Sequence, residues 1–408
     1  MSIDGYWLRL GCKLLAFIVV MWYPTLAAGG DIETAKATEP VETKLGGFAR
    51  VDYYSASKQL DNVNSLPGLT IQPKAQATFG RWGDGKVEGR LQEVDLRGRS
   101  NPQSRLLEAY GTLYLGAMDV RIGKQIMTWG RADFLNPTDN LTPRDFTLLS
   151  AKDEEERRTG SVAVKANRYW GTHTLSLVWL PVFNPSTVPL GPTPGIRLTE
   201  QKRSNGDWTN QGFAVKWDQT GGDLDWSVSY YYGLDLFPIG RPTGPTQVDL
   251  VHTRMHVIGA DAAWTVGRYG IRVEGAYVHT QNPSGEDPFI KKPYVCYVAG
   301  IDRDLTEDLN VSVQAYQRII INYHDPFTVQ GGLAQNIAVL DAVFNQQLDG
   351  FQEGLSGRIK ETWLNKTLEW ELLGVWNANR GDFFVRPLLA YAFTDTWKGF
   401  VGYDIFNG

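Results

Sequence analysis

From residue 45 onward, hydrophobic and polar residues alternate along the chain with a period of two. In residues 224–232, Leu224, Trp226, Val228 and Tyr230 alternate with polar or hydroxyl-bearing neighbours. Side chains two residues apart point to the same face of a β-strand, so each such run predicts a strand with one hydrophobic and one polar face. No stretch with a helical period competes with this pattern. About 17 strands are predicted, near residues 47–55, 71–80, 86–96, 105–115, 119–127, 160–167, 172–180, 211–218, 224–232, 253–264, 269–279, 293–302, 309–321, 354–364, 367–377, 383–393 and 396–406.

The connections between these strands alternate in length. Short links fall near residues 82–85, 116–118, 168–171, 219–222, 266–268, 303–307, 365–366 and 394–395. Longer connections lie between them, at 55–70, 98–104, 128–159, 181–210, 234–252, 280–292 and 323–350, with 377–382 as a short exception. Outer-membrane barrels alternate short periplasmic turns with longer outer loops. The rhythm therefore predicts an all-β fold, a transmembrane antiparallel β-barrel of about 16–18 strands, rather than a sandwich or a propeller.

One hairpin offers a local test of strand pairing. A two-residue turn at Asn365-Lys366 would place Lys360 opposite Glu371 on one face. The same turn places Glu361 opposite Trp370 on the apolar face, close to the turn, where a charge facing lipid costs little. An amphipathic hairpin on a soluble sheet would fit this segment equally well.

The first residues have the pattern of an export signal. Arg9 and Lys13 precede an apolar run at residues 14–26, and small residues follow at 27–30. This pattern predicts a signal peptide at residues 1–28, a flexible N-terminal lead at 29–45 and an outer-membrane β-barrel at 46–408. An uncleaved membrane anchor is the alternative, although the run is shorter than the ~20 residues that a spanning helix needs.

The strand count is odd, whereas a bacterial barrel normally has an even number of strands so that its two ends meet on one side. The last predicted strand, near residues 397–406, would finish at the outer side, and the sequence ends in Asn407-Gly408. We therefore expect the barrel to lack a final strand, or the count to be wrong by one. Without that strand, the first and last strands would run parallel where they meet.

Composition excludes several classes of function. The 408 residues carry a net charge of −5 with a pI near 5.7, so nucleic acid is not an expected partner. Of two cysteines only Cys296 lies beyond the predicted signal, and no metal-ligand spacing is present, so we expect no disulfide, no metal and no cofactor. No Gly-x-Ser-x-Gly frame accompanies the five histidines, so an enzyme is not expected.

The many tryptophans are expected in the aromatic girdles of a barrel. They include Trp129, Trp170, Trp179, Trp217, Trp226, Trp264, Trp363, Trp370, Trp376 and Trp397.

The connection at residues 128–159 is the longest and the most irregular. Two proline steps, Asn136-Pro137 and Thr142-Pro143, break extended pairing, and a charge run follows at residues 153–158. The segment "RIGKQIMTWGRADFLNPTDN" (residues 121–140) resembles a region of Gram-negative outer-membrane porin-like families related to alginate-export-type barrels. That resemblance implies that this third outer loop folds into the lumen and narrows it.

The same resemblance implies where charges would line the pore. On the loop, the expected constriction residues are Arg131, Asp133, Asp139, Arg144 and Asp145. On the barrel wall, the strand parity places Lys74, Arg90, Arg121, Arg272, Arg358, Lys360, Glu369 and Glu371 on the polar face, together with Glu88 and Glu274. Neither sign of charge dominates, and a surface-exposed loop with solvated charges remains the alternative.

The resulting hypothesis is a channel in the cell outer membrane for small hydrophilic solutes. Its partners would be outer-membrane lipid, small polar or ionic solutes and, in a homo-oligomer, further copies of the chain. The alternatives are an exporter of a secreted polymer such as an exopolysaccharide, and a plugged structural or adhesion barrel.

Overall fold

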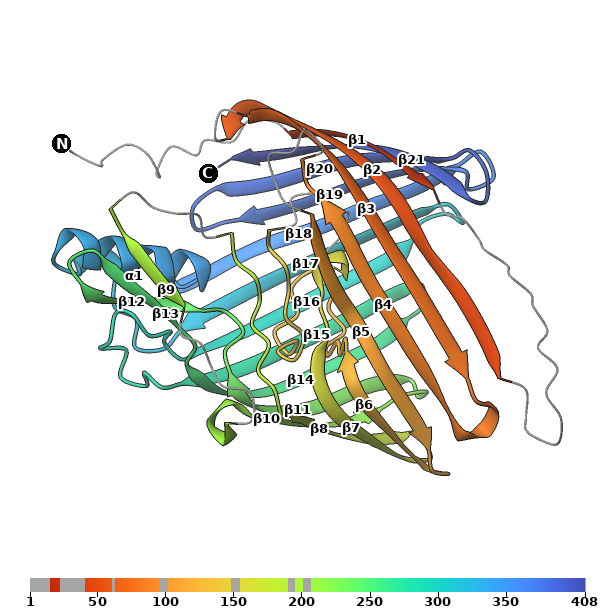
Figure 1. Ribbon diagram of the computed structural model, residues 1–408, viewed down its shortest axis with the longest axis horizontal. Helices are drawn as coiled ribbons and strands as arrows, with labels where there is room; N and C mark the ends of the chain where they lie inside the picture. The colour runs from red at the N-terminus through yellow and green to blue at the C-terminus, as the bar shows by residue number, and fades with distance from the viewer. Residues whose placement is uncertain are drawn as a thin grey trace.

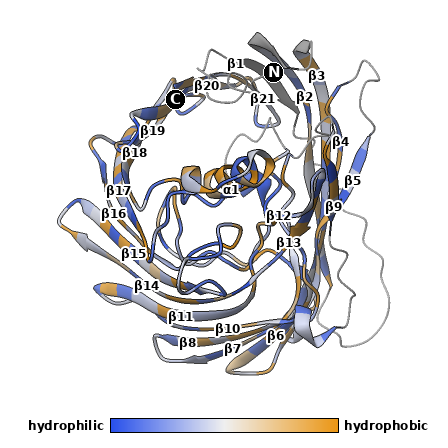
Figure 2. Ribbon diagram, turned by 90° about the vertical axis from the view of Figure 1, so that its left-hand side faces the viewer, coloured by the Kyte–Doolittle hydropathy of each residue, from blue (hydrophilic) through white to orange (hydrophobic). Residues whose placement is uncertain are grey.

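The computed structural model describes residues 15–22, 41–60, 63–95, 102–147, 155–189, 195–200 and 207–407, with the backbone alone at 15–22, 56–60 and 63–64. Its main feature is one large antiparallel sheet that curves around a lumen (Figures 1 and 2). From β2 onward each strand of this sheet pairs antiparallel with the next strand of the sheet along the chain. The strands are β2 (Glu42–Leu60), β3 (Val63–Thr78), β4 (Gly83–Glu93), β5 (Gln103–Tyr114), β6 (Met118–Gln125), β7 (Ser161–Trp170), β8 (His173–Leu180), β10 (Gly212–Gln219), β11 (Leu224–Leu234), β14 (Arg254–Val266), β15 (Tyr269–Thr280), β16 (Tyr294–Asp304), β17 (Leu309–Ile320), β18 (Phe351–Trp363), β19 (Leu368–Asn377), β20 (Asp382–Ala392) and β21 (Trp397–Asn407).

These seventeen strands coincide with the seventeen predicted runs, apart from their ends. No pairing joins β2 to β21 within the described ranges, so the seventeen strands alone leave the sheet open. The backbone of β1 (Leu15–Trp22) lies between them and pairs antiparallel with both. Since β2 and β21 are each antiparallel to β1, they run in the same direction, as the odd count predicted. Cleavage of residues 1–28 concerns processing and stays a prediction.

The register of the test hairpin is confirmed. Lys360 pairs with Glu371, and Glu361 pairs with Trp370. The turn between the strands spans residues 364–367, and Leu364, Asn365 and Lys366 all have positive φ angles of 53° to 65°. The alternating pattern therefore predicted the pairing correctly even though the turn is longer than two residues.

The two faces of the sheet differ in chemistry. Large hydrophobic side chains are exposed on the outer face, including Val51 and Tyr53 on β2, Val87 and Leu91 on β4, Val313 on β17 and Val401 on β21. Charged side chains are buried on the inner face, including Arg50, Asp52, Arg90, Asp261, Glu274 and Asp404. An apolar exterior around a polar interior is the arrangement of a barrel that lies in lipid.

Tryptophan side chains gather near both ends of the strands. Trp82, Trp170, Trp217, Trp363 and Trp397 are exposed toward the short turns, and Trp179 and Trp376 toward the long loops. Amphipathic rings at these two levels form the girdles typical of membrane barrels. The prediction was wrong for Trp129, which is only 5% exposed and lies inside the barrel.

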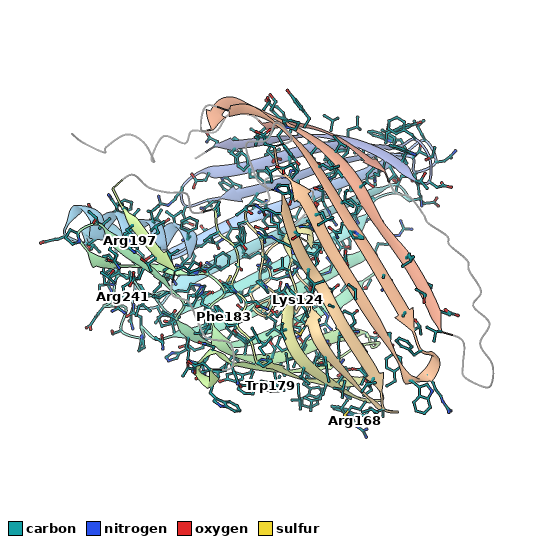
Figure 3. All side chains as sticks on the ribbon, in the orientation of Figure 1. Lys124, Arg168, Trp179, Phe183, Arg197 and Arg241 are labelled. Atoms are coloured by element: carbon teal, nitrogen blue, oxygen red, sulfur yellow. The ribbon has the colours of Figure 1, made fainter. Side chains whose placement is uncertain are left out.

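Long connections gather at one end of the barrel, where Arg197 and Arg241 are labelled in Figure 3, and short turns at the end near Arg168. Three short strands form a second sheet at the loop end: β9 (Arg197–Glu200), β12 (Ile239–Gly244) and β13 (Gln247–Val251). Helix α1 (Gly332–Phe344) packs beside β12, and in the view along the barrel it lies within the ring of strands (Figure 2). In the part of the chain that the structure describes, four single-turn 3-10 helices cover Gly80–Trp82, Glu155–Arg157, Trp208–Asn210 and Pro326–Thr328.

The structure corrects three sequence expectations. The connection predicted at 55–70 is largely strand, because β2 and β3 pair as far as Leu60 and Val63, with a register shift between Ser55 and Leu60. The long connection at 323–350 holds helix α1, although no helical segment was expected. Strand β2 begins at Glu42, within the segment expected to be a flexible lead, while residues 23–40 lie outside the described part of the chain. Within the described residues, no helix is long and apolar enough to cross a membrane.

Candidate functional site in the barrel lumen

The third long connection, residues 126–160 between β6 and β7, lies inside the barrel; we call it the lumen loop. Residues 148–154 of this loop lie outside the described ranges. Where the loop leaves β6, it is bound to β5, because Glu108 Oε1 on β5 accepts the backbone N–H of Ile126 at 2.9 Å. Thr142 then ties the loop to itself, because its hydroxyl accepts the N–H of Met127 (2.9 Å) and donates to the Met127 carbonyl (2.8 Å).

One side of the lumen loop is apolar and packs on the wall. Met127, Trp129 and Leu141 are at most 5% exposed and form a cluster with Ala163, Val178, Leu180, Ala214, Tyr231, Met255, Val257, Ala276 and Val278. These wall residues come from β7, β8, β10, β11, β14 and β15. Burial of this apolar surface holds the loop against one sector of the wall, so the loop narrows the lumen from that side.

Farther along the loop, the backbone encloses a single carboxylate of the wall. Glu274 Oε2 on β15 accepts the backbone N–H groups of Arg131 (3.0 Å) and Ala132 (3.1 Å). Glu274 Oε1 accepts both the backbone N–H and the hydroxyl of Thr138 at 2.8 Å each. Four donors therefore converge on one buried carboxylate, and hydrogen bonds to a charged acceptor are the stronger kind; we call this contact the Glu274 latch.

Two glycines make the latch sterically feasible. Gly130 has a φ of +91°, and a Cβ atom there would overlap the Glu274 carboxylate. Gly259 on β14 faces Thr138, whose Cγ2 would lie 2.5 Å from an added Cβ. The Trp-Gly step of the sequence motif therefore has a physical reason: only glycine lets the backbone approach Glu274 at this angle.

Side-chain ion pairs reinforce the latch on neighbouring strands. Arg131 bonds to Asp218 on β10 (2.7 Å) and to Asp261 on β14. Asp133 pairs with Arg272 on β15 at 2.7 Å. The tip of the lumen loop is therefore bound to the wall over several strands.

The returning arm of the loop reaches the opposite part of the wall. Glu156 accepts from Arg50 on β2 at 2.6 Å, and its backbone carbonyl accepts from Arg90 on β4 at 2.9 Å. Arg105 on β5 pairs with Asp145 at 2.7 Å. Because its contacts extend from β2, β4 and β5 to β10, β14 and β15, the loop spans the lumen.

The five predicted constriction residues all lie on this loop, but their exposures differ. The Asp139 side chain is fully buried between Arg144 (2.8 Å) and Arg158, and that of Asp145 is 1% exposed. Arg131, Asp133 and Arg144 keep 16%, 32% and 20% of their side-chain surface. Asp139 and Asp145 thus hold the loop together, while the three partly exposed residues are the ones that can face a solute.

The predicted wall residues lie on the inward face of their strands. Arg90 and Arg272 bind the lumen loop as described, and Arg121 donates to Thr112 at 2.9 Å. Lys360 pairs with Glu369 at 3.1 Å. Lys74, Arg358 and Glu371 make no hydrogen bond or ion pair with another described residue. Their roles in selectivity stay predictions.

The sequence pattern placed Glu274 on the wall without indicating its function, and it did not single out Asp261, Asp218 or Arg50. Glu156 was noted only as part of the charge run at residues 153–158, which was not expected at the constriction. The loop partners Arg131 and Glu274 are separated by 143 residues, so neither spacing nor parity pairs them. The available signal was weaker: Asp261 and Glu274 are acidic residues on inward faces where, toward the long loops, the neighbouring positions Val257, Gly259, Ala276 and Val278 carry small or aliphatic side chains.

Helix α1 is tied to the mouth of the barrel at two points. Arg318 on β17 donates to the carbonyls of Asn345 (3.1 Å) and Gln346 (3.3 Å) at the helix C-terminus, where a cation is favoured. Asp341 Oδ1 accepts the N–H of Gly240 on β12 at 2.7 Å, while its Oδ2 is buried without a hydrogen bond. Burial raises the pKa of the Asp341 carboxyl well above its usual range.

Within the described residues, no group of three or more His, Cys, Asp or Glu side chains could hold a metal ion.

No protein-family model and no curated protein matches the sequence. Solved structures do resemble the fold. A loop-deletion variant of OmpT, an outer membrane protein of Vibrio cholerae, has 10% identity and a TM-score of 0.43, over 97% of this chain and 98% of that chain.

Two further structures are similar at the same level. The outer membrane channel DcaP of Acinetobacter baumannii has 12% identity and a TM-score of 0.43, over 99% of each chain. OccK5 of Pseudomonas aeruginosa has 8% identity and a TM-score of 0.43, over 98% of this chain and 97% of that chain. By its strand pairing, its apolar exterior and its inserted third loop, the chain has a porin-like β-barrel fold.

Proposed function

We propose that the protein is an outer-membrane channel for passive passage of small hydrophilic solutes. The observation that carries this proposal is the lumen loop, which crosses a polar-lined barrel and is bound to its wall on both sides. A loop fixed in this way narrows the lumen without requiring a mobile gate. Water-lined irregular backbone of this kind is tolerated inside a barrel, because its polar groups are satisfied by the wall and by water.

Charges of both signs face the lumen, which favours a general solute pore over a strongly ion-selective one. Near the loop, Asp133 and Arg272 form an ion pair in which each side chain is 32% exposed. On the far wall, Lys360 and Glu369 form another pair. A continuous basic stripe would favour export of an acidic polymer instead. We expect the barrel to lie in outer-membrane lipid, alone or as a homo-oligomer.

The experiment is single-channel recording of the chain refolded in detergent and inserted into planar bilayers. We expect discrete conductance steps. We expect deletion of residues 136–148 to increase the conductance, because the deletion shortens the loop inside the lumen and removes Thr138, which supplies two of the four donors to Glu274. Absence of conductance in a refolded, β-rich preparation would contradict the channel. Equal conductance with and without residues 136–148 would contradict a constriction by this loop.

A plugged barrel is the second candidate, and one observation favours it. The apolar side of the lumen loop packs into a wall cluster that includes Trp129 and Leu141, as a plug would, and helix α1 lies within the ring of strands at the mouth (Figure 2). A plugged barrel predicts no steady conductance in the full-length chain and the appearance of conductance after removal of the loop segment.

A further inference from the structure

Two cationic side chains face each other across adjacent strands inside the barrel. Arg121 on β6 is the direct cross-strand partner of Lys165 on β7. Both belong to the inward face, since Arg121 Nε donates to Thr112 Oγ1 at 2.9 Å and Ala163, two residues from Lys165, packs under the lumen loop. Like charges directly opposite each other destabilise a sheet. Folding alone therefore gives no reason for this pair.

No carboxylate of the described residues forms an ion pair with Lys165. It makes no hydrogen bond or ion pair with another described residue, and the charged groups that act on it are Arg121, Lys216 and Asp119. Lys216 is engaged by Asp218 at 2.7 Å. The carboxylate of Asp119 accepts from Asn167 Nδ2 (2.9 Å) and from the Tyr169 hydroxyl, so its hydrogen-bonding oxygens are turned toward those groups.

The surroundings of the pair suit an anion. The Arg121 guanidinium carbon lies 4.2 Å from the centre of the Tyr110 ring, which holds the guanidinium in place. Lys165 and Arg121 are both partly exposed. Ala163 lies two residues before Lys165 on the same inward face, nearer the long loops, and it contacts the lumen loop. A solute that has passed the loop therefore meets this pair on the short-turn side.

We propose that Arg121 and Lys165 form a subsite for a small oxyanion solute, a carboxylate or a phosphate. The guanidinium presents paired N–H donors that match two oxygens of such a group, and the ammonium adds a point charge from the adjacent strand. A bound oxyanion would also relieve the repulsion between the two cations. This subsite rests on the proposed channel function and specifies one class of solute for it.

The test compares Lys165→Gln with the matched control Lys360→Gln, whose ammonium already has Glu369 at 3.1 Å as its partner. Binding of succinate and of inorganic phosphate to the refolded protein is measured by calorimetry, and reversal potentials are measured in a potassium chloride gradient. For Lys165→Gln we expect roughly tenfold weaker anion binding and a shift toward cations. For Lys360→Gln we expect a binding change below about twofold, since its charge is already compensated. Lys165→Arg should restore binding.

The outcomes separate the two proposals. Binding of succinate alone, or of phosphate alone, supports the subsite and identifies the solute as a carboxylate or as a phosphate. No binding of either anion to the unmodified chain, or equal loss in both glutamine variants, overturns the subsite even if the channel conducts. Anion binding that depends on Lys165 in a barrel that does not conduct would support the subsite while refuting the channel.

Discussion

Replacing Glu274 by Gln keeps the shape of the side chain and removes half of its accepting capacity. Four donors from the lumen loop converge on the two carboxylate oxygens. An amide can accept only at one oxygen, so two of these donors would face an NH₂ group. Each hydrogen bond to a charged acceptor contributes about 1.5–3 kcal/mol. Since water in the lumen can replace part of the loss, we expect the docked loop to be weakened by about 3 kcal/mol.

A change of this size raises the population of undocked loop by a factor of roughly 100. We expect Glu274→Gln to show frequent transitions to a higher conductance level in single-channel records. Hydrogen exchange gives a second readout that does not depend on conduction: the amides of Arg131, Ala132 and Thr138 should lose protection. The strand ladder is untouched, so the melting temperature of the barrel itself should not change.

The matched control is Glu371→Gln, which removes the same charge from the inward face of β19. Glu371 makes no hydrogen bond or ion pair with another described residue, so the loop should stay docked. Equal behaviour of the two variants would show that charge in the lumen, and not the latch, sets the loop position. Full protection of the three amides in Glu274→Gln would refute the reasoning directly.

Three further outcomes are expected. Gly130→Ala should reproduce the noisy conductance of Glu274→Gln, because a Cβ would overlap the carboxylate and a φ of +91° costs about 1–2 kcal/mol for alanine; quiet records would contradict the steric argument. Asp133→Asn should shift the reversal potential toward anions, because Arg272 loses a partner at 2.7 Å; an unchanged potential would place the pair outside the solute path. Because burial raises the pKa of Asp341, the docking of α1 should be tightest below about pH 4, where the carboxyl is protonated in either state, and should weaken as pH rises through the raised pKa. Hydrogen exchange of α1 between pH 4 and 8 measures this, and Asp341→Asn should abolish the dependence.

The strands were predictable because their pattern depends on a local rule. On each strand, one face meets an apolar exterior and the other a polar lumen, so alternation is forced at every residue pair. The pairing of Lys360 with Glu371 followed from turn position alone. Helix α1 was missed although Leu333, Ile337, Leu340 and Phe344 recur at helical spacing. The period of two dominates the rest of the chain, and this one helical pattern lies within a long connection, where it was not noticed.

The candidate site was only partly predictable, because its contacts depend on how one loop folds in three dimensions. The charges of the loop were recognised, yet Asp139 proved to be enclosed by two arginines of the same loop. Burial of that kind depends on the turn at residues 136–145, which no periodicity specifies. The position of the loop inside the lumen came from the resemblance of the sequence motif, and not from alternation or charge.

The Glu274 latch also bears on how such a channel can change over evolutionary time. Three of its four donors are backbone N–H groups, which every residue except proline supplies. The side chain at Ala132 can therefore be exchanged without removing any of these donors, whereas a change at Arg131 keeps the backbone donor and removes only the ion pairs to Asp218 and Asp261. The solute preference of the pore can drift by substitution on the loop while Gly130 and Glu274 keep the aperture in place.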